Sequence, residues 1–281
     1  MGWADLAAEV REEQQVLIVL NSRKDALAVR EELGNGPDVF HLSTLLCGAH
    51  RRNVLTQVAD RLRRGEPVRL VSTQVVECGV DLDFPVVYRA VGPLDRIVQA
   101  AGRCNRHQIR AWGRVVIFEP ANGGAPAGPY RDGMETARFL LRLHGAEGLH
   151  DPETYADYFR RLYRKVNLDE RGIQPLREAH NYPAVAKLYK LIDSDTVSVV
   201  VPYGAEWKPR LDAWLANPSR RAWRLLQPYL VSLYRHEVQK HTEWLQEIGE
   251  DIYRCWDGGY DAKRHRGMVG RFTDPSDLVP S

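Results

Sequence analysis

The sequence has no long apolar run and no leader-like N-terminus. No apolar segment among the 281 residues approaches the about 20 residues that a membrane-spanning helix requires. Residues 1–15 carry three glutamates and one aspartate, and they lack the basic and then apolar order of a signal peptide. We therefore expect a cytoplasmic protein.

Paired metal-binding or disulfide-forming cysteines are also missing. The four cysteines are scattered along the chain, at Cys47, Cys78, Cys104 and Cys255. No two of them have the CxxC spacing of a zinc site, and four isolated cysteines do not make a disulfide framework. We expect reduced thiols and no metal site.

Two apparent metal motifs are better explained without a metal. His150–Asp151 is an isolated HD dipeptide, and Asp151 stands before Pro152 as a helix N-cap does. His236 and His241 are five residues apart, which places them about 140° apart around a helix. Such a pair does not chelate one zinc ion from one helix face.

Composition and charge are those of a soluble globular protein, with 44% hydrophobic and 27% charged residues and a net charge of +2. Arginines nevertheless cluster locally. Residues 96–114 hold five arginines and no acidic residue, and residues 51–69 hold six arginines against Asp60 and Glu66. Solvated helix faces and a phosphate-facing surface both produce such clusters, and both interpretations remain open.

The first 119 residues alternate between two kinds of segment. Short apolar, β-branched runs occupy residues 16–20, 39–42, 68–72, 86–91 and 115–118. Between them, residues 25–33 and 50–64 have helical composition and spacing. Continuous apolar strands alternating with helices predict an α/β domain, a parallel sheet flanked by helices. Such sheets bind ligands beyond the carboxyl ends of their strands.

The rest of the chain has a different character. Residues 120–133 are rich in Pro, Gly and Ala and predict a linker. Residues 134–281 predict a mainly helical accessory domain, with helices near 134–143 and 154–166, one strand at 196–202 and more helix through Glu247. Five of the seven tryptophans lie here, at positions 207, 214, 223, 244 and 256. They are either core residues or a surface on which bases stack.

A first candidate site follows the apolar run that ends at residue 72. Thr73 stands where the strand ends, so its hydroxyl and backbone N–H can donate to a phosphate. Gly79 allows a ligand to approach the backbone closely, and Asp81 can accept hydrogen bonds from a ribose hydroxyl. Alone, this pattern is common in α/β proteins.

A second candidate site lies in residues 95–106, DRIVQAAGRCNR. Gln99, Arg103 and Arg106 are four and three residues apart and fall on one face of a helix, where Gly102 leaves room. Two guanidinium groups and an amide at one point suit the charge of a transferring phosphoryl group. In isolation, the same segment would also fit a surface helix with salt bridges.

Together, these segments resemble motifs V and VI of superfamily 2 helicases. STQVVECGVDLDF (residues 72–84) and DRIVQAAGRCNR are most similar to the helicase-nuclease of type I CRISPR interference systems. HLSTLLCGAHRR (residues 41–52) and VLIVLNSRKDA (residues 16–26) resemble the same family, the latter in its motif IV region. The resemblance is specific over residues 14–119 and weaker in the C-terminal part. It implies a RecA-like second helicase lobe at residues 1–119, followed by an accessory domain.

The resemblance also implies roles for particular residues. ATP with Mg²⁺ would lie between two lobes, with Arg103 and Arg106 as arginine fingers, Gln99 near the γ-phosphate, and Gly79 and Asp81 on the nucleotide. A tracked single strand of DNA would be held by its phosphates. The residues implied for that contact are Asn21, Ser22, Ser43, Thr44, Thr73 and Gln74.

Three parts of a working motor are not found in this sequence. None of the 22 glycines is followed by lysine, so there is no P-loop. A DExx box and the HD nuclease of the family are not found either. We therefore expect a component that is inactive alone. Its expected partners are single-stranded DNA, a first RecA-like lobe and HD nuclease in cis or in trans, and the CRISPR surveillance complex. The alternatives are a non-catalytic DNA- or protein-binding module and a lobe of another superfamily 2 helicase, such as an RNA helicase.

Overall fold

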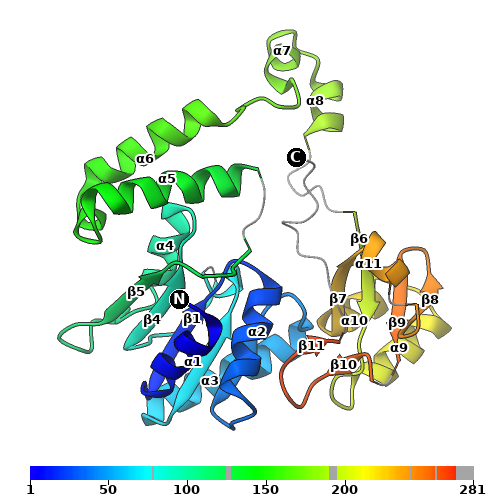
Figure 1. Cartoon of the computed structure of the whole chain (residues 1–281). Coiled ribbons are helices and arrows are strands. Elements are labelled where there is room, and N and C mark those ends of the chain that lie inside the picture. Colours follow the sequence, from blue (N-terminus) through cyan, green and yellow to red (C-terminus); the bar gives the residue numbers. More distant parts are fainter. Residues whose placement is uncertain (78, 125–127, 190–194, 241, 257, 270–281) are drawn as a thin grey trace.

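The computed structural model describes residues 1–77, 79–124, 128–189, 195–240, 242–256 and 258–269 (Figure 1). Cys78 and part of the predicted linker lie outside the described residues. In the part of the chain that is described, no helix combines the length and the apolar character needed to cross a membrane.

A five-stranded parallel sheet forms the first domain. Its strands are β1 (Gln15–Val19), β2 (Val39–Leu42), β3 (Val68–Ser72), β4 (Val86–Ala90) and β5 (Arg114–Phe118). They lie in the order β2-β3-β1-β4-β5, so the chain crosses over between hydrogen-bonded neighbours. The central strand β1 is buried along its whole length, as continuous β-branched runs predict. The predicted α/β fold is confirmed.

Helices cover both faces of this sheet. On one face, α1 (Trp3–Arg11) and α2 (Arg23–Leu33) contribute apolar side chains to a shared core cluster. On the other face, α3 (Gly48–Arg64) and α4 (Leu94–Ala101) pack with the turn that contains the 3₁₀ segment η1 (Gln74–Val76). The face that holds α3, η1 and α4 therefore carries both candidate motifs.

A helical arm follows the sheet. It consists of α5 (Pro129–His144), the 3₁₀ turn η2 (Glu147–His150), α6 (Pro152–Lys165), α7 (Ile173–Glu178) and α8 (Tyr182–Leu188). Side chains of α4, α5 and α6 share one small core, so the arm packs against the helix that carries the start of motif VI (Figure 1). The Asp151 carboxylate accepts a hydrogen bond from the Glu153 N–H at 3.0 Å, as expected of an N-cap. The first arm helix begins inside the range predicted as a linker.

The C-terminal part contains a second sheet. Its strands are β6 (Thr196–Val200), β7 (Leu230–Tyr234), β8 (Leu245–Gly249) and β9 (Ile252–Cys255), in the order β7-β6-β9-β8. Its helices are α9 (Trp207–Ala216), α10 (Arg220–Leu226) and α11 (Arg235–Lys240), and the 3₁₀ turn η3 (Gln227–Tyr229) precedes β7. Helical segments prevail in residues 134–269, and the strand predicted near residue 196 is confirmed.

The expectation of helix through Glu247 is wrong for two stretches. Residues 230–234 and 245–249 are strands, and both pair antiparallel with neighbours. Short apolar runs do not distinguish strand from helix by periodicity, and here pairing with β6 and β9 decides. In β7, Val231 and Leu233 point to the core while Ser232 points to solvent, which is the alternation of a half-buried strand.

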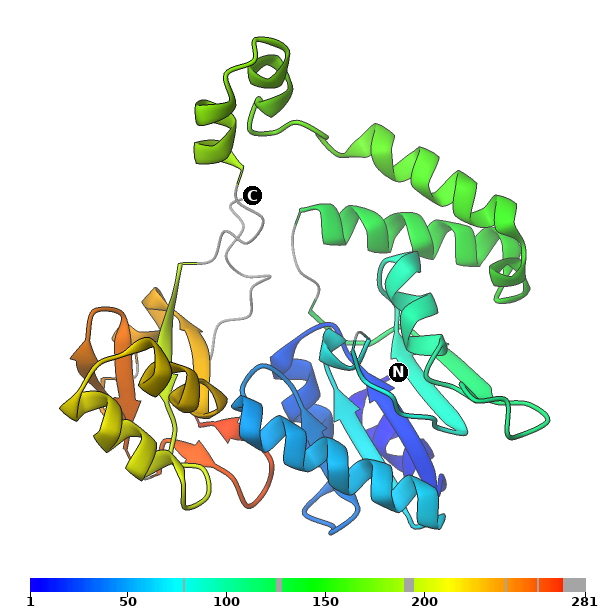
Figure 2. The same ribbon diagram turned by 180° about the vertical axis from the view of Figure 1, so that it is seen from behind.

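A small hairpin, β10 (Tyr260–Asp261) and β11 (Gly267–Met268), joins the two parts of the molecule. It lies between α3 and the C-terminal sheet (Figure 2). Leu45 and Cys47 of the first domain belong to the same buried cluster as side chains of β6, β7 and β9. The two parts therefore share a hydrophobic core.

Candidate functional site

The six residues predicted to contact DNA lie at the carboxyl ends of three strands. Asn21 and Ser22 follow β1, Ser43 and Thr44 follow β2, and Thr73 and Gln74 follow β3. These strands are neighbours in the sheet, so the six residues lie together at the carboxyl end of the sheet, which we call the strand edge. The side-chain amide of Gln74 donates to the Asn21 carbonyl at 2.9 Å.

Most of these side chains have structural partners at that edge. The Ser22 hydroxyl accepts from the Asp25 N–H and caps α2, while the Ser43 hydroxyl accepts from the Leu45 N–H at 3.2 Å. Asn21 and Thr73 are buried, and Gln74 is half-buried. Thr44 is the exposed member of the set. Only the loop after β2 therefore presents a predicted DNA-contacting side chain fully to solvent.

A buried arginine of β4 contacts the residues at the strand edge. The Arg89 side chain is fully buried, and its Nη1 donates to Asn21 Oδ1 at 2.8 Å. Its Nη2 lies 3.4 Å from Glu77 Oε1, and Tyr130 Oη donates to the same Asn21 oxygen at 2.8 Å. Gln74 Nε2 also reaches Tyr130 Oη, at 3.2 Å. The network links the ends of β1 and β3 to β4 and α5.

Sequence reasoning missed this network, although one sign of it was present. Arg89 interrupts the apolar run Val86–Val91, and a charge inside a buried strand requires a buried partner. That partner is Glu77, which Arg96 also approaches, with Nη1 and Oε2 3.3 Å apart. Burial raises the pKa of Glu77, and the two guanidinium groups work against that shift.

Backbone hydrogen bonds join the two candidate motifs. The Phe84 N–H donates to the Arg103 carbonyl and the Asn105 N–H donates to the Phe84 carbonyl, both at 2.9 Å. Arg103 is buried, with 6% of the residue exposed. Its guanidinium donates to the carbonyls of Val76 and Glu77, at 3.0 and 2.5 Å. Arg103 therefore holds the turn after β3 against the end of α4.

Arg106 and Asp81 form the exposed part of this junction. Arg106 Nε donates to Asp81 Oδ1 at 3.0 Å, and His107 Nε2 lies 3.4 Å from the same oxygen. Gly79 has a φ of +71°, and a Cβ added there would meet nothing within 4 Å. Gln99 lies on α4 and is partly buried. This helix ends at Ala101, so Arg103 and Arg106 lie beyond it, and the prediction that all three residues share one helix face is wrong. A cation, an acceptor and open backbone thus face solvent side by side.

The structure separates the two interpretations of the arginine clusters. All five arginines of residues 96–114 have acidic or carbonyl partners from other segments. In residues 51–69, four arginines form ion pairs, namely Arg61, Arg63, Arg64 and Arg69. Among the described residues, Arg51 and Arg52 have neither an ion pair nor a side-chain hydrogen bond. These two are the arginines whose charge is available.

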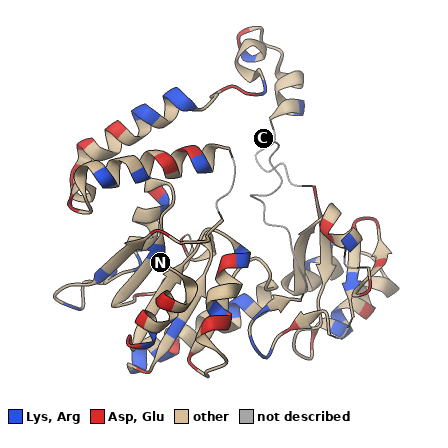
Figure 3. Ribbon diagram, viewed as in Figure 1, with Lys and Arg blue, Asp and Glu red and all other residues tan. Residues whose placement is uncertain are grey.

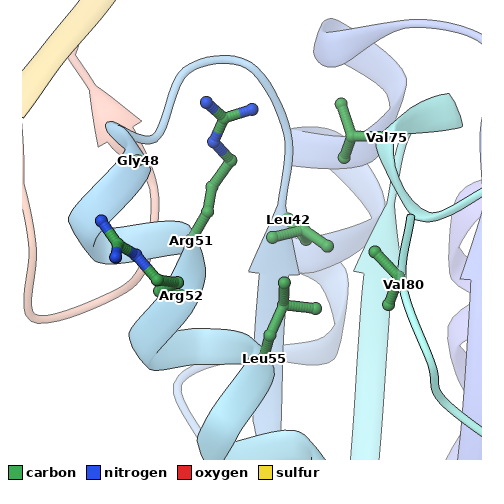
Figure 4. Close-up of a pocket in the computed structure, with 7 residues that line it drawn as sticks. All are labelled: Leu42, Gly48, Arg51, Arg52, Leu55, Val75 and Val80. Carbon is green, nitrogen blue, oxygen red and sulfur yellow. The ribbon is translucent and has the colours of Figure 1, made fainter. Parts of the chain in front are cut away.

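Arg51 and Arg52 stand beside a pocket at the start of α3 (Figure 4). The side chains of Leu42, Leu55, Val75 and Val80 point toward this pocket from β2, α3 and the turn after β3. The two arginines project from α3 at its rim. Figure 3 shows that other Lys and Arg positions are spread along the ribbon of the same domain among Asp and Glu positions. The pocket offers an apolar wall under two available cations.

The tryptophans of the C-terminal part are mostly core residues. Trp207, Trp214 and Trp223 pack against a buried cluster around Leu211, and Trp244 packs against the core shared with the first domain. Trp256 is 43% exposed, with the Arg254 guanidinium 4.3 Å from its ring centroid. The core interpretation fits four of the five, while Trp256 offers one face to solvent.

Comparison with known proteins agrees with the fold and the motifs. The family described as "CRISPR-associated nuclease/helicase Cas3, C-terminal" matches residues 12–109. The CRISPR-associated nuclease/helicase Cas3 of Haloferax volcanii is 53% identical over 76 residues, which are 25% of this chain and 8% of that protein. Cas3 of Methanothermobacter thermautotrophicus is 29% identical over 249 residues, 87% of this chain and 28% of that protein.

A solved structure shows the same fold. The crystal structure of T. fusca Cas3-AMPPNP superposes with a TM-score of 0.60 at 17% identity, over 89% of this chain and 37% of that chain. The predicted resemblance and the RecA-like fold are therefore confirmed. The chain matches less than a third of the length of either curated relative.

Proposed function

We propose that the chain is the C-terminal part of a Cas3-type helicase and that it supplies one side of an ATP-driven motor. In this proposal, residues 1–119 are the second RecA-like lobe of a single-stranded DNA translocase of type I CRISPR interference. Residues 134–281 are its accessory domain. Hydrolysis requires a first lobe, in cis or in trans, because this sequence contains no P-loop and no DExx box.

The observation that carries the proposal is the exposed pair Arg106–Asp81 on the joined motifs. Its two side chains are 40% and 72% exposed, so a nucleotide bound to a facing lobe can reach both. We propose that Arg106 exchanges the Asp81 carboxylate for a phosphoryl group, to which its planar fork can donate two parallel hydrogen bonds. Asp81 is then free to accept from a ribose hydroxyl, and Gly79 allows the nucleotide to approach the backbone.

Arg103 and Gln99 complete the proposed half-site in different ways. The Arg103 guanidinium already donates to two carbonyls of the turn after β3, so its contacts in this lobe support a role in holding that turn. Its role as a second finger, implied by the resemblance, stays a prediction. Gln99 lies on α4, shortly before the helix ends at Ala101, and its proposed place is near the γ-phosphate.

The nucleotide itself would be held mainly by the other lobe. This half fits one side of a nucleotide site, since it offers a cation, an acceptor and an open glycine but no phosphate cradle. When bound, ATP with Mg²⁺ supplies the phosphoryl group and the metal that neutralises its charge. The residues of this chain then orient the nucleotide and place positive charge beside it.

DNA contacts are proposed at the strand edge and the start of α3. Thr44 is exposed there, and Arg51 and Arg52 are available to pair with phosphates. Asn21, Ser22, Ser43, Thr73 and Gln74 would act through backbone groups and by keeping the edge in shape. Phosphate contacts of this kind hold a strand without selecting its sequence. The HD nuclease and the CRISPR surveillance complex are proposed as further partners of the whole motor.

The deciding experiment is reconstitution with a first lobe. The 281-residue chain is mixed with a polypeptide that carries the P-loop and DExx box of a Cas3 relative, and ATP hydrolysis is measured with and without single-stranded DNA. We expect DNA-stimulated turnover from the mixture and none from this chain alone. Turnover by the chain alone contradicts the proposal. DNA binding without any stimulated turnover, across first lobes of several relatives, favours the non-catalytic module.

Single-stranded RNA separates the remaining alternative. Hydrolysis stimulated by DNA and not by RNA, at a stated salt concentration, supports the translocase of CRISPR interference. Stimulation by RNA alone instead identifies a lobe of an RNA helicase. Salt has to be fixed because phosphate contacts dominate the affinity in both cases.

A further inference from the structure

The hairpin β10–β11 is hydrogen-bonded to the loop that carries Ser43 and Thr44 and to the residues on either side of that loop. This loop runs from the end of β2 to the start of α3, and the hairpin comes from more than 200 residues further along the chain. The ribbon of the hairpin lies beside the start of α3 in Figure 2. Five hydrogen bonds between the two segments are found, and they involve both ends of the loop as well as its middle.

Three of these bonds form a chain through two histidines. The Cys47 N–H donates to Tyr260 Oη at 3.1 Å, and the same oxygen lies 2.8 Å from His50 Nδ1. His50 Nε2 lies 2.9 Å from His265 Nδ1. One hydroxyl fixes the backbone of the loop and the ring at the start of α3 together.

The other two bonds hold the middle and the β2 end of the loop. The Met268 N–H donates to the Leu45 carbonyl at 3.0 Å, and His41 Nδ1 lies 2.9 Å from the His265 carbonyl. Gly267 has a φ of +77°, and a Cβ added there would lie 2.3 Å from the Leu45 oxygen. The hairpin approaches so closely that only glycine fits at this position.

Packed rings add to the contact between the two parts of the molecule. The His50 ring stacks on Tyr203 of the C-terminal part with centroids 4.4 Å apart, and the His265 ring stacks on Phe40 of β2 at 5.3 Å. Each part of the molecule therefore supplies a ring that packs on a histidine of the other. His41 and His50 are fully buried, and His265 is partly buried at the edge of the arrangement.

We propose that Tyr260 and Gly267 are positioning residues for the Ser43–Thr44 loop, through which the accessory domain sets the affinity of the lobe for single-stranded DNA. Within the loop, the Ser43 hydroxyl and the Leu46 N–H make only short-range bonds. Without the hairpin, the backbone at Leu45 and Cys47 loses its partners and the loop has to be ordered when DNA binds. That ordering reduces affinity without touching the nucleotide half-site. This inference rests on the proposed function, because it takes DNA as the ligand of the loop.

The test uses two small substitutions in the hairpin, one that removes a single hydroxyl and one that adds a single methyl group. Tyr260→Phe removes one hydroxyl and keeps the ring, while Gly267→Ala removes no polar group and pushes on the Leu45 carbonyl. Tyr253→Phe is the matched control, because its hydroxyl makes no hydrogen bond to any of the described residues. For each full-length chain, hydrogen exchange of the amides at residues 43–47 and the Kd for labelled single-stranded DNA are measured.

We expect faster exchange at residues 43–47 and a Kd raised about five- to tenfold for Tyr260→Phe, the change that corresponds to one net hydrogen bond. Gly267→Ala should act in the same direction, and Tyr253→Phe should match the wild type. In the reconstituted motor, the KM for DNA should rise while kcat at saturating DNA stays unchanged. That separation distinguishes positioning of the loop from general damage to the fold.

Two outcomes overturn the inference separately from the proposed function. Wild-type DNA affinity in both variants overturns it, whether or not exchange at residues 43–47 is faster, since the loop would then not control binding. An equal loss of kcat and DNA affinity overturns it as well, because the effect would not be confined to the loop. Failure of the wild-type chain to bind DNA overturns the proposed DNA contact, on which the inference rests.

Discussion

Arg23 of α2 and Glu237 of α11 form a buried ion pair between the two parts of the molecule. Arg23 Nη2 and Glu237 Oε1 are 3.1 Å apart, and the side chains are 9% and 0% exposed. The second carboxylate oxygen of Glu237 accepts from the Tyr234 N–H at 2.9 Å. The carboxylate thus ties α2 to the end of β7 as well as to its own helix.

Removing this carboxylate should destabilise the whole chain. Glu237→Ala removes the carboxylate that pairs with the buried Arg23 guanidinium, and breaking such a buried pair costs about 3–5 kcal/mol in the free energy of unfolding. Urea unfolding measures the change. Glu247→Ala, an exposed glutamate of β8 in the same part of the molecule, serves as the control and should shift stability by less than about 0.5 kcal/mol. Equal effects of the two substitutions would contradict the role of the ion pair.

Stability should fall with acid because of the histidines at the hairpin. Burial is the main cause that lowers the pKa of His41 to about 4 and that of His50 to about 3, and the charge of nearby Arg30 contributes at His41. An unfolded histidine has a pKa of about 6.5, so below that pH the unfolded chain binds protons that the folded chain does not. The free energy of unfolding should therefore drop between about pH 6.5 and pH 4. Each such group contributes about 1.4 kcal/mol per pH unit.

Urea unfolding at several pH values between 7 and 4.5 checks this dependence. His50→Gln should reduce the slope by about one proton, whatever its effect on stability at pH 7. His144→Gln, at an exposed position on α5, is the control and should leave the slope as it is. A slope unchanged by His50→Gln would rule out His50 as a source of the acid sensitivity.

Arg103 and Arg106 should respond differently to truncation. Arg106 is exposed and pairs with an exposed aspartate, so Arg106→Ala should fold with a Tm close to that of the wild type. In the reconstituted motor, it should reduce the hydrolysis rate by about 10³–10⁵, as removal of an arginine finger does. Loss of nucleotide turnover is measured with the Tm of the same preparation.

Arg103→Ala should instead lower stability. The carbonyls of Val76 and Glu77 lose a buried donor, which costs about 1–3 kcal/mol and loosens the turn after β3. Thermal unfolding with hydrogen exchange in residues 74–77 measures this. If Arg103→Ala is as stable as Arg106→Ala, the positioning role of Arg103 is wrong and its role as a finger gains support.

The two available arginines of α3 should determine part of the salt dependence of DNA binding. Replacing Arg51 and Arg52 by alanine should weaken binding to single strands of any sequence. It should also reduce the slope of log K against log salt by about 1.4, since each single-strand phosphate contact contributes about 0.7. The control replaces Arg63 and Arg64, at the other end of the same helix, where both form ion pairs. An unchanged slope in the first double variant would exclude Arg51 and Arg52 as phosphate contacts.

The parallel sheet could be predicted from the sequence because its strands are buried on both faces. Each apolar run of the first 119 residues contains or overlaps a strand. Ser22 caps the start of α2 and Gly65 caps the end of α3, as Ser and Gly commonly do. The strands at residues 230–234 and 245–249 could not be predicted in the same way. Their conformation depends on partners supplied by β6 and β9, which sequence periodicity does not contain.

The candidate site was predictable only where it is local in sequence. Gln99, Arg103 and Arg106 are close in sequence, but the helix face predicted for them does not form, because α4 ends at Ala101. The structure puts Asp81 beside Arg106. The partners of Asn21 could not be foreseen, since Arg89 and Tyr130 come from distant segments. The same holds for the hairpin contacts, whose donors and acceptors are separated by more than 200 residues.

The hydrogen bonds that tie Phe84 to the backbone on either side of Cys104 have a mechanical consequence. We expect a displacement of Arg106 to move Phe84 as well, because the segment of Arg106 and the segment before β4 share backbone hydrogen bonds. Arg103 passes the same displacement to Glu77, and Glu77 lies against Arg89, which holds Asn21. A continuous path of hydrogen bonds and an ion pair therefore joins the proposed nucleotide face to the carboxyl end of β1.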